Sequence, residues 1–353
     1  MTAASTTRRF DFASDNVTCA SPQIMAALHA ANVDCVASYG EDRLSSALQN
    51  RVAELFECEV TVLPMTTGTA ANALALSALC KPYEAVYCHQ SAHVMTDECG
   101  APEFFSAGAK LIGLPGAQGR LQAEDLEAAC ALARSMGVHH VQPAALTLSQ
   151  ATEWGTVYTP DALKTLTDSA HRLGLRTHLD GARFANALVH LGCRPADISW
   201  RAGIDVLSLG ATKNGALAAE ALVVFDQSVV QELLFRRKRA GHLWSKMRFL
   251  SAQLLAYLSD DLWLHNARQA NTMATRLSQG LSALPSVRVV QPVEANEVFV
   301  EMPTECIERL RATGYHFYDW PAPAGIHGAV IRLVTSFDVC AADVDALILA
   351  AHR

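Results

Sequence analysis

The sequence is poor in charged residues and has no long apolar run. Only 18% of its 353 residues are Asp, Glu, Lys or Arg, while half are hydrophobic, a balance that excludes a disordered chain. The net charge of −7 argues against nucleic acid as the main partner, because no basic face is built. No apolar run approaches the ~18 residues of a membrane span, and no secretory signal opens the chain. We therefore expect a globular, cytoplasmic protein with no membrane partner.

The sequence also lacks the usual spacings of metal and disulfide sites. Its ten cysteines are scattered, with no C-x-x-C pair, which favours buried reduced thiols in a cytosolic protein. The only tight clusters of metal-ligand residue types are His139-His140 and His178-x-Asp180, and neither has a third ligand nearby in the sequence. We expect no metal site.

Apolar patterns alternate between strand and helix over the first two thirds of the chain. Ser21-Pro22 is typical of a helix start. Repeated β-then-α units predict an α/β fold with a mainly parallel sheet covered by helices on both faces. The predicted strands are 59–63, 85–88, 145–148, 176–180, 205–209 and 221–225, and the predicted helices are 45–57, 70–79, 122–135, 160–173 and 184–191.

The pattern changes after residue 226 and predicts a second, smaller α+β domain. We place the boundary so that residues 1–255 form an N-terminal arm and large domain and residues 256–353 form the small C-terminal domain. The predicted elements of this part are helices 227–258 and 261–284, strands 287–290 and 298–301, helix 304–312, strand 330–334 and helix 341–351.

One lysine stands apart from the other charged residues of the chain. Lys213 follows the apolar strand 205–209 and lies among small residues, whereas a surface lysine usually shares a solvated helix face with other charges. In open parallel sheets, ligands bind beyond the carboxyl ends of the strands. Four strand ends carry candidate residues of this kind: Thr67, Gly68 and Thr69; His93; Asp180 with Arg183; and Lys213.

These residues together match the needs of pyridoxal 5′-phosphate. A lysine amine forms a Schiff base with the cofactor's aldehyde, and a carboxylate keeps its pyridine nitrogen protonated. A glycine at a helix N-terminus lets backbone N–H groups approach a phosphate. Each feature alone has an ordinary explanation: Gly68 in a simple turn, His93 as a structural histidine, Asp180 as a cap. Their order along the chain, with Asp180 and Lys213 about one βαβ unit apart, favours the cofactor.

Over nearly its whole length the chain resembles the L-threonine aldolases, fold-type I pyridoxal-phosphate enzymes grouped with the β-eliminating lyases. The fold implied is that of this class, with a large cofactor-binding domain and a small C-terminal one. The motifs that carry the resemblance are Tyr39-Gly-Glu-Asp42, Thr67-Gly-Thr-Ala-Ala-Asn72, His93 with Glu98 and Gly100, His178-Leu-Asp-Gly-Ala-Arg183 and Thr212-Lys-Asn-Gly215.

The resemblance implies a role for each matching residue. Lys213 would be the Schiff-base lysine, Asp180 the partner of the pyridine nitrogen, and His93 the residue that stacks on the ring and approaches the substrate hydroxyl as candidate base. Further cofactor and substrate residues follow from the same motifs: Thr67, Gly68 and Thr69 for the phosphate, Ser14, Arg183 and Arg332 for the substrate carboxylate, and Tyr39 with basic residues of 236–248 reaching a neighbouring subunit's site.

Two stretches depart from the family pattern. The glycine-rich G-G-G-M-R-Q of many relatives is replaced by Gly241-His-Leu-Trp-Ser-Lys-Met-Arg248, so either Lys246 or Arg248 could serve the neighbouring site. Many relatives have E-N-T-H where this chain has Ser149-Gln-Ala-Thr-Glu153, so contacts near the cofactor differ there.

The implied reaction is retro-aldol cleavage of L-threonine or L-allo-threonine to glycine and an aldehyde, by a homo-oligomer such as a dimer of dimers. Several alternatives stay open. An aldolase for a β-aryl serine such as phenylserine, a β-eliminating lyase and a racemase would all use Lys213 and Asp180. A catalytically inactive cofactor-binding module is disfavoured, because the lysine, aspartate, arginine and histidine are all present and no nucleic-acid-binding appendage is apparent.

Overall fold

A seven-stranded sheet forms the larger part of the fold. The computed structural model describes residues 9–323 and 325–352. The strand order is β1-β7-β6-β5-β4-β2-β3, and β3, β2, β4, β5 and β6 are parallel, whereas β7 runs antiparallel to both β6 and β1. The strands span Thr61–Met65 (β1), Glu84–His89 (β2), Lys110–Leu114 (β3), Gln142–Ser149 (β4), Arg176–Gly181 (β5), Val206–Gly210 (β6) and Glu220–Val224 (β7).

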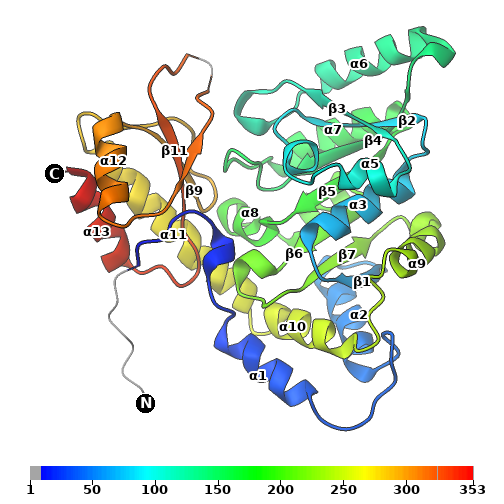
Figure 1. The fold of residues 1–353 in the computed structure, drawn as a ribbon. Coiled ribbons are helices and arrows are strands. Elements are labelled where there is room, and N and C mark those ends of the chain that lie inside the picture. The colour runs from blue at the N-terminus through cyan, green and yellow to red at the C-terminus, as the bar shows by residue number, and fades with distance from the viewer. Residues whose placement is uncertain (1–8, 324, 353) are drawn as a thin grey trace.

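Helices cover both faces of this sheet (Figure 1). Alternate side chains of β6 point to opposite faces: Val206 packs in the core below α3, whereas Leu207 and Leu209 pack in the core on the other face. Helices α3 (Gly68–Leu79), α5 (Ala101–Phe105) and α9 (Val230–Arg239) share the first core. The second core is shared by α1 (Pro22–Ala31), α2 (Arg43–Phe56), α6 (Ala123–Ser135), α7 (Pro160–Arg172), α8 (Phe184–Leu191) and α10 (Arg248–Leu258).

A second, four-stranded antiparallel sheet lies in the C-terminal part of the chain. Its order is β10-β11-β9-β8, and its core also includes Phe12 from the N-terminal segment. Phe12 donates its N–H to His316 O and accepts from Val334 N, both at 2.8 Å, so the first described residues pack with the last part of the chain. Its elements are α11 (Leu262–Ser282), β8 (Arg288–Val289), β9 (Glu297–Glu301), α12 (Thr304–Ala312), β10 (Tyr318–Trp320), β11 (Val330–Val334) and α13 (Ala341–His352).

The fold class predicted from the sequence is confirmed: a mainly parallel sheet between helices, followed by a small α+β part. The domain boundary at residue 255 stays a prediction. The single helix expected over 227–258 is wrong, because the chain leaves the helix after Arg239, turns at Gly241 with φ of +80°, and re-enters a helix only at Arg248. The strands β3 and β10 were not predicted, and α4 (His93–Thr96) and α5 were also missed.

Gly210, at the end of β6, provides a stability test. A Cβ at this position would lie 2.6 Å from the carbonyl oxygen of Ala182 and 2.7 Å from its Cα, and backbone atoms cannot move aside cheaply. Gly210→Ala should lower the free energy of unfolding in urea by about 1–3 kcal/mol through overpacking. The matched control is Gly68→Ala in cofactor-free protein, where no atom lies within 4 Å of the added Cβ. Equal stabilities for the two variants would contradict the close approach.

Candidate active site

A pocket of about 300 Å³ opens at the carboxyl edge of the parallel strands. Since β7 is antiparallel to both β1 and β6, strand β1 runs in the same direction as β6 and delivers its own carboxyl end to this edge. Seven predicted site residues line the pocket: Thr67, Gly68, Thr69, His93, Asp180, Arg183 and Lys213.

The turn that carries Lys213 is anchored from below. Lys213 lies in a 3₁₀ turn, Thr212–Asn214, directly after β6. The buried Asn214 donates 2.8 Å hydrogen bonds to the Tyr257 hydroxyl and the Trp263 carbonyl, which tie the turn to α10 and α11. Within residues 9–323 and 325–352, the Lys213 amine has no hydrogen-bond or ion-pair partner. A rigid turn thus presents a free amine to the pocket.

The N-terminus of α3 forms another wall of the pocket. Thr67 caps the helix, since its hydroxyl accepts from Ala70 N at 3.2 Å. Nothing lies within 4 Å of the position that a Cβ on Gly68 would occupy, so the first turn leaves open space beside its N–H groups. Such a helix end favours an anion. Thr67, Gly68 and Thr69 therefore fit a phosphate group.

A chain of buried polar groups joins His93 to Asp180. His93 Nδ1 lies 2.9 Å from Glu98 Oε1, and Asn72 Nδ2 donates to Glu98 Oε1 at 2.9 Å and to Asp180 Oδ2 at 2.8 Å. Leu179 faces the opposite core, so its neighbour Asp180 points toward α3, where Asn72 lies. The second Asp180 oxygen accepts from Ala182 N at 2.9 Å. The carboxylate is held in a fixed orientation at the floor of the pocket.

This network shifts the proton affinities of His93 and Glu98. The hydrogen bond that His93 donates to Glu98 raises the pKa of His93, because the imidazolium form donates more strongly to a carboxylate. Burial raises the pKa of Glu98, whose side chain is fully covered. The pair therefore shares a proton more readily than either group would alone.

Two further carboxyl groups line the pocket. Burial raises the pKa of Glu220 to about 7, although its Oε2 accepts from Ala211 N at 2.8 Å. Burial likewise raises the pKa of Glu153 to about 7. Neither residue was predicted as a site residue, although Glu153 lies in a stretch that departs from the family pattern.

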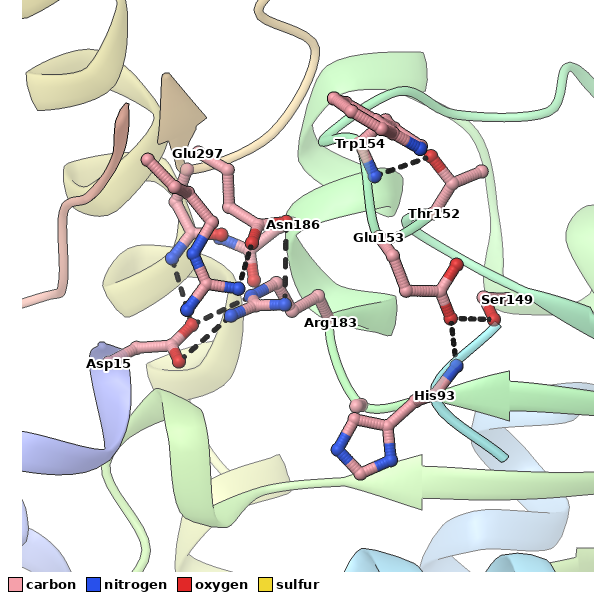
Figure 2. Close-up of polar contacts among 12 residues, drawn as sticks. Asp15, His93, Ser149, Thr152, Glu153, Trp154, Arg183, Asn186 and Glu297 are labelled. Carbon is pink, nitrogen blue, oxygen red and sulfur yellow. Dashed lines mark hydrogen bonds and ion pairs between the residues drawn. The ribbon is translucent and has the colours of Figure 1, made fainter. Parts of the chain in front are cut away.

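Arg183 belongs to a buried ion cluster on the side of the pocket next to the C-terminal part of the chain (Figure 2). Its Nε and Nη2 donate to the two oxygens of Asp15 at 2.8 and 3.0 Å. Its Nη1 lies 3.3 Å from Glu297, whose other oxygen is 3.5 Å from Arg332 Nη1. The neighbouring carboxylates Asp15 and Glu297 raise the pKa of Arg183 against the effect of burial, so its charge is permanent. The positive charges of Arg183 and Arg332 are thus matched by the negative charges of Asp15 and Glu297.

Three predicted substrate residues do not line the pocket. Ser14 caps a short turn by accepting from Asn16 N at 3.1 Å, and Asn16 lines the pocket in its place. Arg332 donates to Ala13 O at 3.2 Å and stacks on Trp320 at 4.5 Å, beside the pocket. Tyr39 is 48% exposed and lies under Lys238 Nζ at 4.7 Å, in a separate hollow also lined by Lys246.

Among the described residues, no three His, Cys, Asp or Glu side chains gather closely enough to hold a metal ion. Over these residues no helix combines the length and the apolar character needed to cross a membrane.

Comparison with known proteins agrees with the pocket's residue set. A family profile described as beta-eliminating lyase matches residues 11–305. The low specificity L-threonine aldolase of Pseudomonas aeruginosa is 45% identical over 314 residues, which cover 89% of this chain and 90% of that protein. The chain belongs to the threonine aldolases of the beta-eliminating lyase family.

A solved threonine aldolase structure and a racemase sequence extend this comparison. A structure of Leishmania major threonine aldolase superimposes with a TM-score of 0.91 at 29% identity, covering 98% of this chain and 99% of that one. An alanine racemase of Cochliobolus carbonum is 29% identical over 236 residues, 66% of this chain and 58% of that protein. The fold therefore follows the threonine aldolases along its whole length, while part of it is shared with a racemase.

Several residues of the pocket were not predicted as site residues, and the sequence contains a signal for some of them only. Asn72 is a polar residue in an otherwise apolar helix, which is a usable signal for a buried hydrogen-bonding role. Glu98 lies in a recognised motif but was given no role. Glu153 and Glu220 follow no periodic pattern, and only the folded chain shows that they reach one pocket.

Asn72 provides a test of the polar network. Asn72→Ala would leave the Glu98 and Asp180 carboxylates without a shared donor, so the free energy of unfolding should fall by about 1–3 kcal/mol. The loss should be larger at pH 8 than at pH 5, because protonation of Glu98 relieves the repulsion between the two carboxylates. Urea denaturation at both pH values measures this effect. Asn50→Ala, on the exposed face of α2, is the control, and an equal effect of both changes would contradict the network.

Proposed function

We propose that this protein is a pyridoxal-phosphate-dependent aldolase that cleaves L-threonine or L-allo-threonine to glycine and an aldehyde. The observation that carries the proposal is one pocket that combines the free amine of Lys213, the fixed carboxylate of Asp180, His93 and the open N-terminus of α3. The relatives named as low specificity L-threonine aldolases support the reaction.

The residues present fit the cofactor at three points. The open space beside Gly68 would take the phosphate, the Asp180 carboxylate would hold the protonated ring nitrogen, and the Lys213 amine, which has no partner among the described residues, would bond the aldehyde carbon. Pyridoxal phosphate supplies an electron sink for the pair released when a bond to the substrate's Cα breaks. His93 would lie against the ring, held in place through Nδ1 by Glu98.

Arg332 and Ser14 are proposed to hold the substrate carboxylate. Arg332 has a buried Nε without a partner among the described residues, and its guanidinium lies beside the backbone of Ala13. Arg183 uses both edges of its guanidinium on Asp15 and Glu297, so we assign it the positioning of Arg332 through Glu297 as much as direct contact with the substrate. By fixing the carboxylate, these residues would determine which bond at Cα is oriented for cleavage.

Assembly into a homo-oligomer, a dimer of dimers, is part of the proposal. Tyr39 and the segment 236–248 lie next to each other outside the pocket, as residues that complete a neighbour's site would. Exposed apolar side chains on and next to this surface support an interface: Phe235 (69%) and Trp244 (44%). A cytoplasmic setting is supported by the ten cysteines, which are all described and all unpaired.

Racemisation is the second candidate, since the alanine racemase relative shares part of the chain. Phenylserine cleavage and β-elimination would also use Lys213 and Asp180. Product analysis separates these reactions, because only an aldolase releases glycine.

Lys213→Ala tests the proposed reaction. Cofactor-loaded wild type should release glycine from L-threonine, L-allo-threonine or L-phenylserine, and the variant should lose at least about 10³-fold in turnover because no other amine can bond the aldehyde. Glycine measured by chromatography is the readout. Lys164→Ala, which removes an exposed i,i+4 pair with Asp168, should retain wild-type turnover. Full activity of Lys213→Ala, or racemised substrate without glycine, would end the aldolase proposal.

Asp180→Asn tests the carboxylate's role in holding the cofactor. Asparagine keeps an acceptor for Asn72 but removes the charge, so cofactor binding should weaken roughly 10- to 100-fold, the equivalent of about 1.5–3 kcal/mol for a hydrogen bond to a charged group. Absorbance titration of cofactor-free protein with pyridoxal phosphate gives the affinity. Unchanged affinity together with unchanged turnover would remove Asp180 from the site.

A further inference from the structure

Glu153 is a pocket residue whose carboxyl group is only half engaged. Its Oε1 accepts the Ser149 hydroxyl at 2.6 Å and the backbone N–H of His93 at 2.8 Å, as Figure 2 shows. Its Oε2 is buried and has no hydrogen-bond partner among the described residues. Buried polar atoms are nearly always paired, so an unpaired one in a ligand pocket indicates a group that meets the ligand.

No cation neutralises Glu153. Within residues 9–323 and 325–352 it forms no ion pair, and the guanidinium of Arg183 is committed to Asp15 and Glu297. A carboxyl group kept in a wall without a counter-ion is expensive to bury in its charged form. A purely structural role would be met more cheaply by an amide or an apolar side chain.

The surroundings place this carboxyl near its protonation midpoint at neutral pH. Burial raises the pKa of Glu153 to about 7, the Asp180 carboxylate adds to this, and the bonds from Ser149 and His93 N oppose it. The other titratable groups that face it are Arg183, Tyr158 and Cys88. Burial raises the pKa of Cys88 to about 12 and that of Tyr158 still further, so both stay neutral at pH 7.

We propose that Glu153 is a catalytic residue that takes the proton of the substrate's β-hydroxyl through its unpartnered Oε2. This inference rests on the proposed function. As the Cα–Cβ bond breaks, its electron pair stays with Cα, the hydroxyl oxygen forms the C=O of the aldehyde, and the hydroxyl proton passes to Oε2. Cα then takes up one proton to give glycine, and Glu153 releases one, so protons and electrons balance.

His93 is the competing base in the same pocket. Its Nδ1 is engaged with Glu98, and that hydrogen bond raises its pKa, so a larger share of His93 is already protonated at neutral pH. Glu153 has a free oxygen and a proton affinity matched to the operating pH, the condition for an efficient general base. We therefore assign ring contact to His93 and the proton to Glu153.

Glu153→Gln is the test variant, because glutamine keeps the size and an acceptor for Ser149 and for His93 N. The rate of threonine cleavage should fall about 10²- to 10⁴-fold, the usual contribution of a general base. In wild type, kcat/KM should rise with pH through about 7 as Glu153 ionises, and the variant should lose that rise. Glu294→Gln is the control, because Glu294 accepts from Val157 N outside the pocket and should keep wild-type rates.

Two readouts separate this proposal from a folding or cofactor defect. Cofactor affinity and the exchange of glycine's α-proton in D₂O should stay within about twofold in Glu153→Gln, since glycine has no β-hydroxyl. In cofactor-free protein, the infrared difference between wild type and variant should show a protonated-carboxyl band that disappears as pH rises through about 7.

The results of these measurements distinguish a wrong role for Glu153 from a wrong aldolase function. A wild type that releases no glycine from any β-hydroxy amino acid overturns the proposed function. A wild type that cleaves threonine, with a Glu153→Gln variant that retains the rate and the pH rise, overturns only the role of Glu153. Loss of cleavage together with equal loss of α-proton exchange would also count against it, because the defect would then lie upstream of the hydroxyl.

Discussion

The pocket contains more carboxyl groups than cations, and this imbalance governs its chemistry. Burial raises the pKa values of Glu98, Glu153 and Glu220, and the negative charge of Asp180 raises them further, because neighbouring carboxyl groups resist joint ionisation. The excess negative charge of these carboxyl groups is neutralised by bound protons or by cationic groups of a bound molecule. Four carboxyl groups line the pocket, Glu98, Glu153, Asp180 and Glu220, together with two basic side chains, Arg183 and Lys213.

These carboxyl groups differ in which hydrogen-bond donors their oxygens accept from, and therefore in what each can do. Asp180 accepts from Asn72 and from Ala182 N, so both of its oxygens are fixed and it can only stabilise charge. Glu98 is tied to His93 and orients that ring. Glu153 and Glu98 each combine a bonded oxygen with a buried oxygen that has no partner among the described residues, but the bonded oxygen of Glu98 holds the His93 ring, whereas that of Glu153 is bonded by the Ser149 hydroxyl and the backbone N–H of His93.

The order of strand ends along the sequence was enough to predict that Lys213, Asp180 and His93 meet in one pocket. Asp180 lies at the end of a buried parallel strand, whereas His93 and Lys213 follow the ends of two others, and parallel strands deliver their carboxyl ends to one edge. The local pattern could not find β3, whose Gly113 interrupts a short apolar run, or the break after Arg239 in a stretch rich in helix formers. Nor could it place Arg332, because its position depends on how the second sheet packs beside the first.

A buried ion cluster lies where the two parts of the chain pack together, beside the apolar contact of Trp154 with Phe299. Asp15 from the N-terminal segment, Arg183 from the large sheet and Glu297 from β9 meet in one place, and Asn296 donates to Asp15 at 3.0 Å. Buried ion pairs add little net stability, because desolvation offsets the attraction. They do, however, demand one geometry, since a shift of either sheet would leave a charge unpaired. The cluster therefore constrains where Arg332 lies relative to Lys213, and, if Arg332 holds the substrate carboxylate as proposed, it would also set the distance from that carboxylate to the reacting carbon.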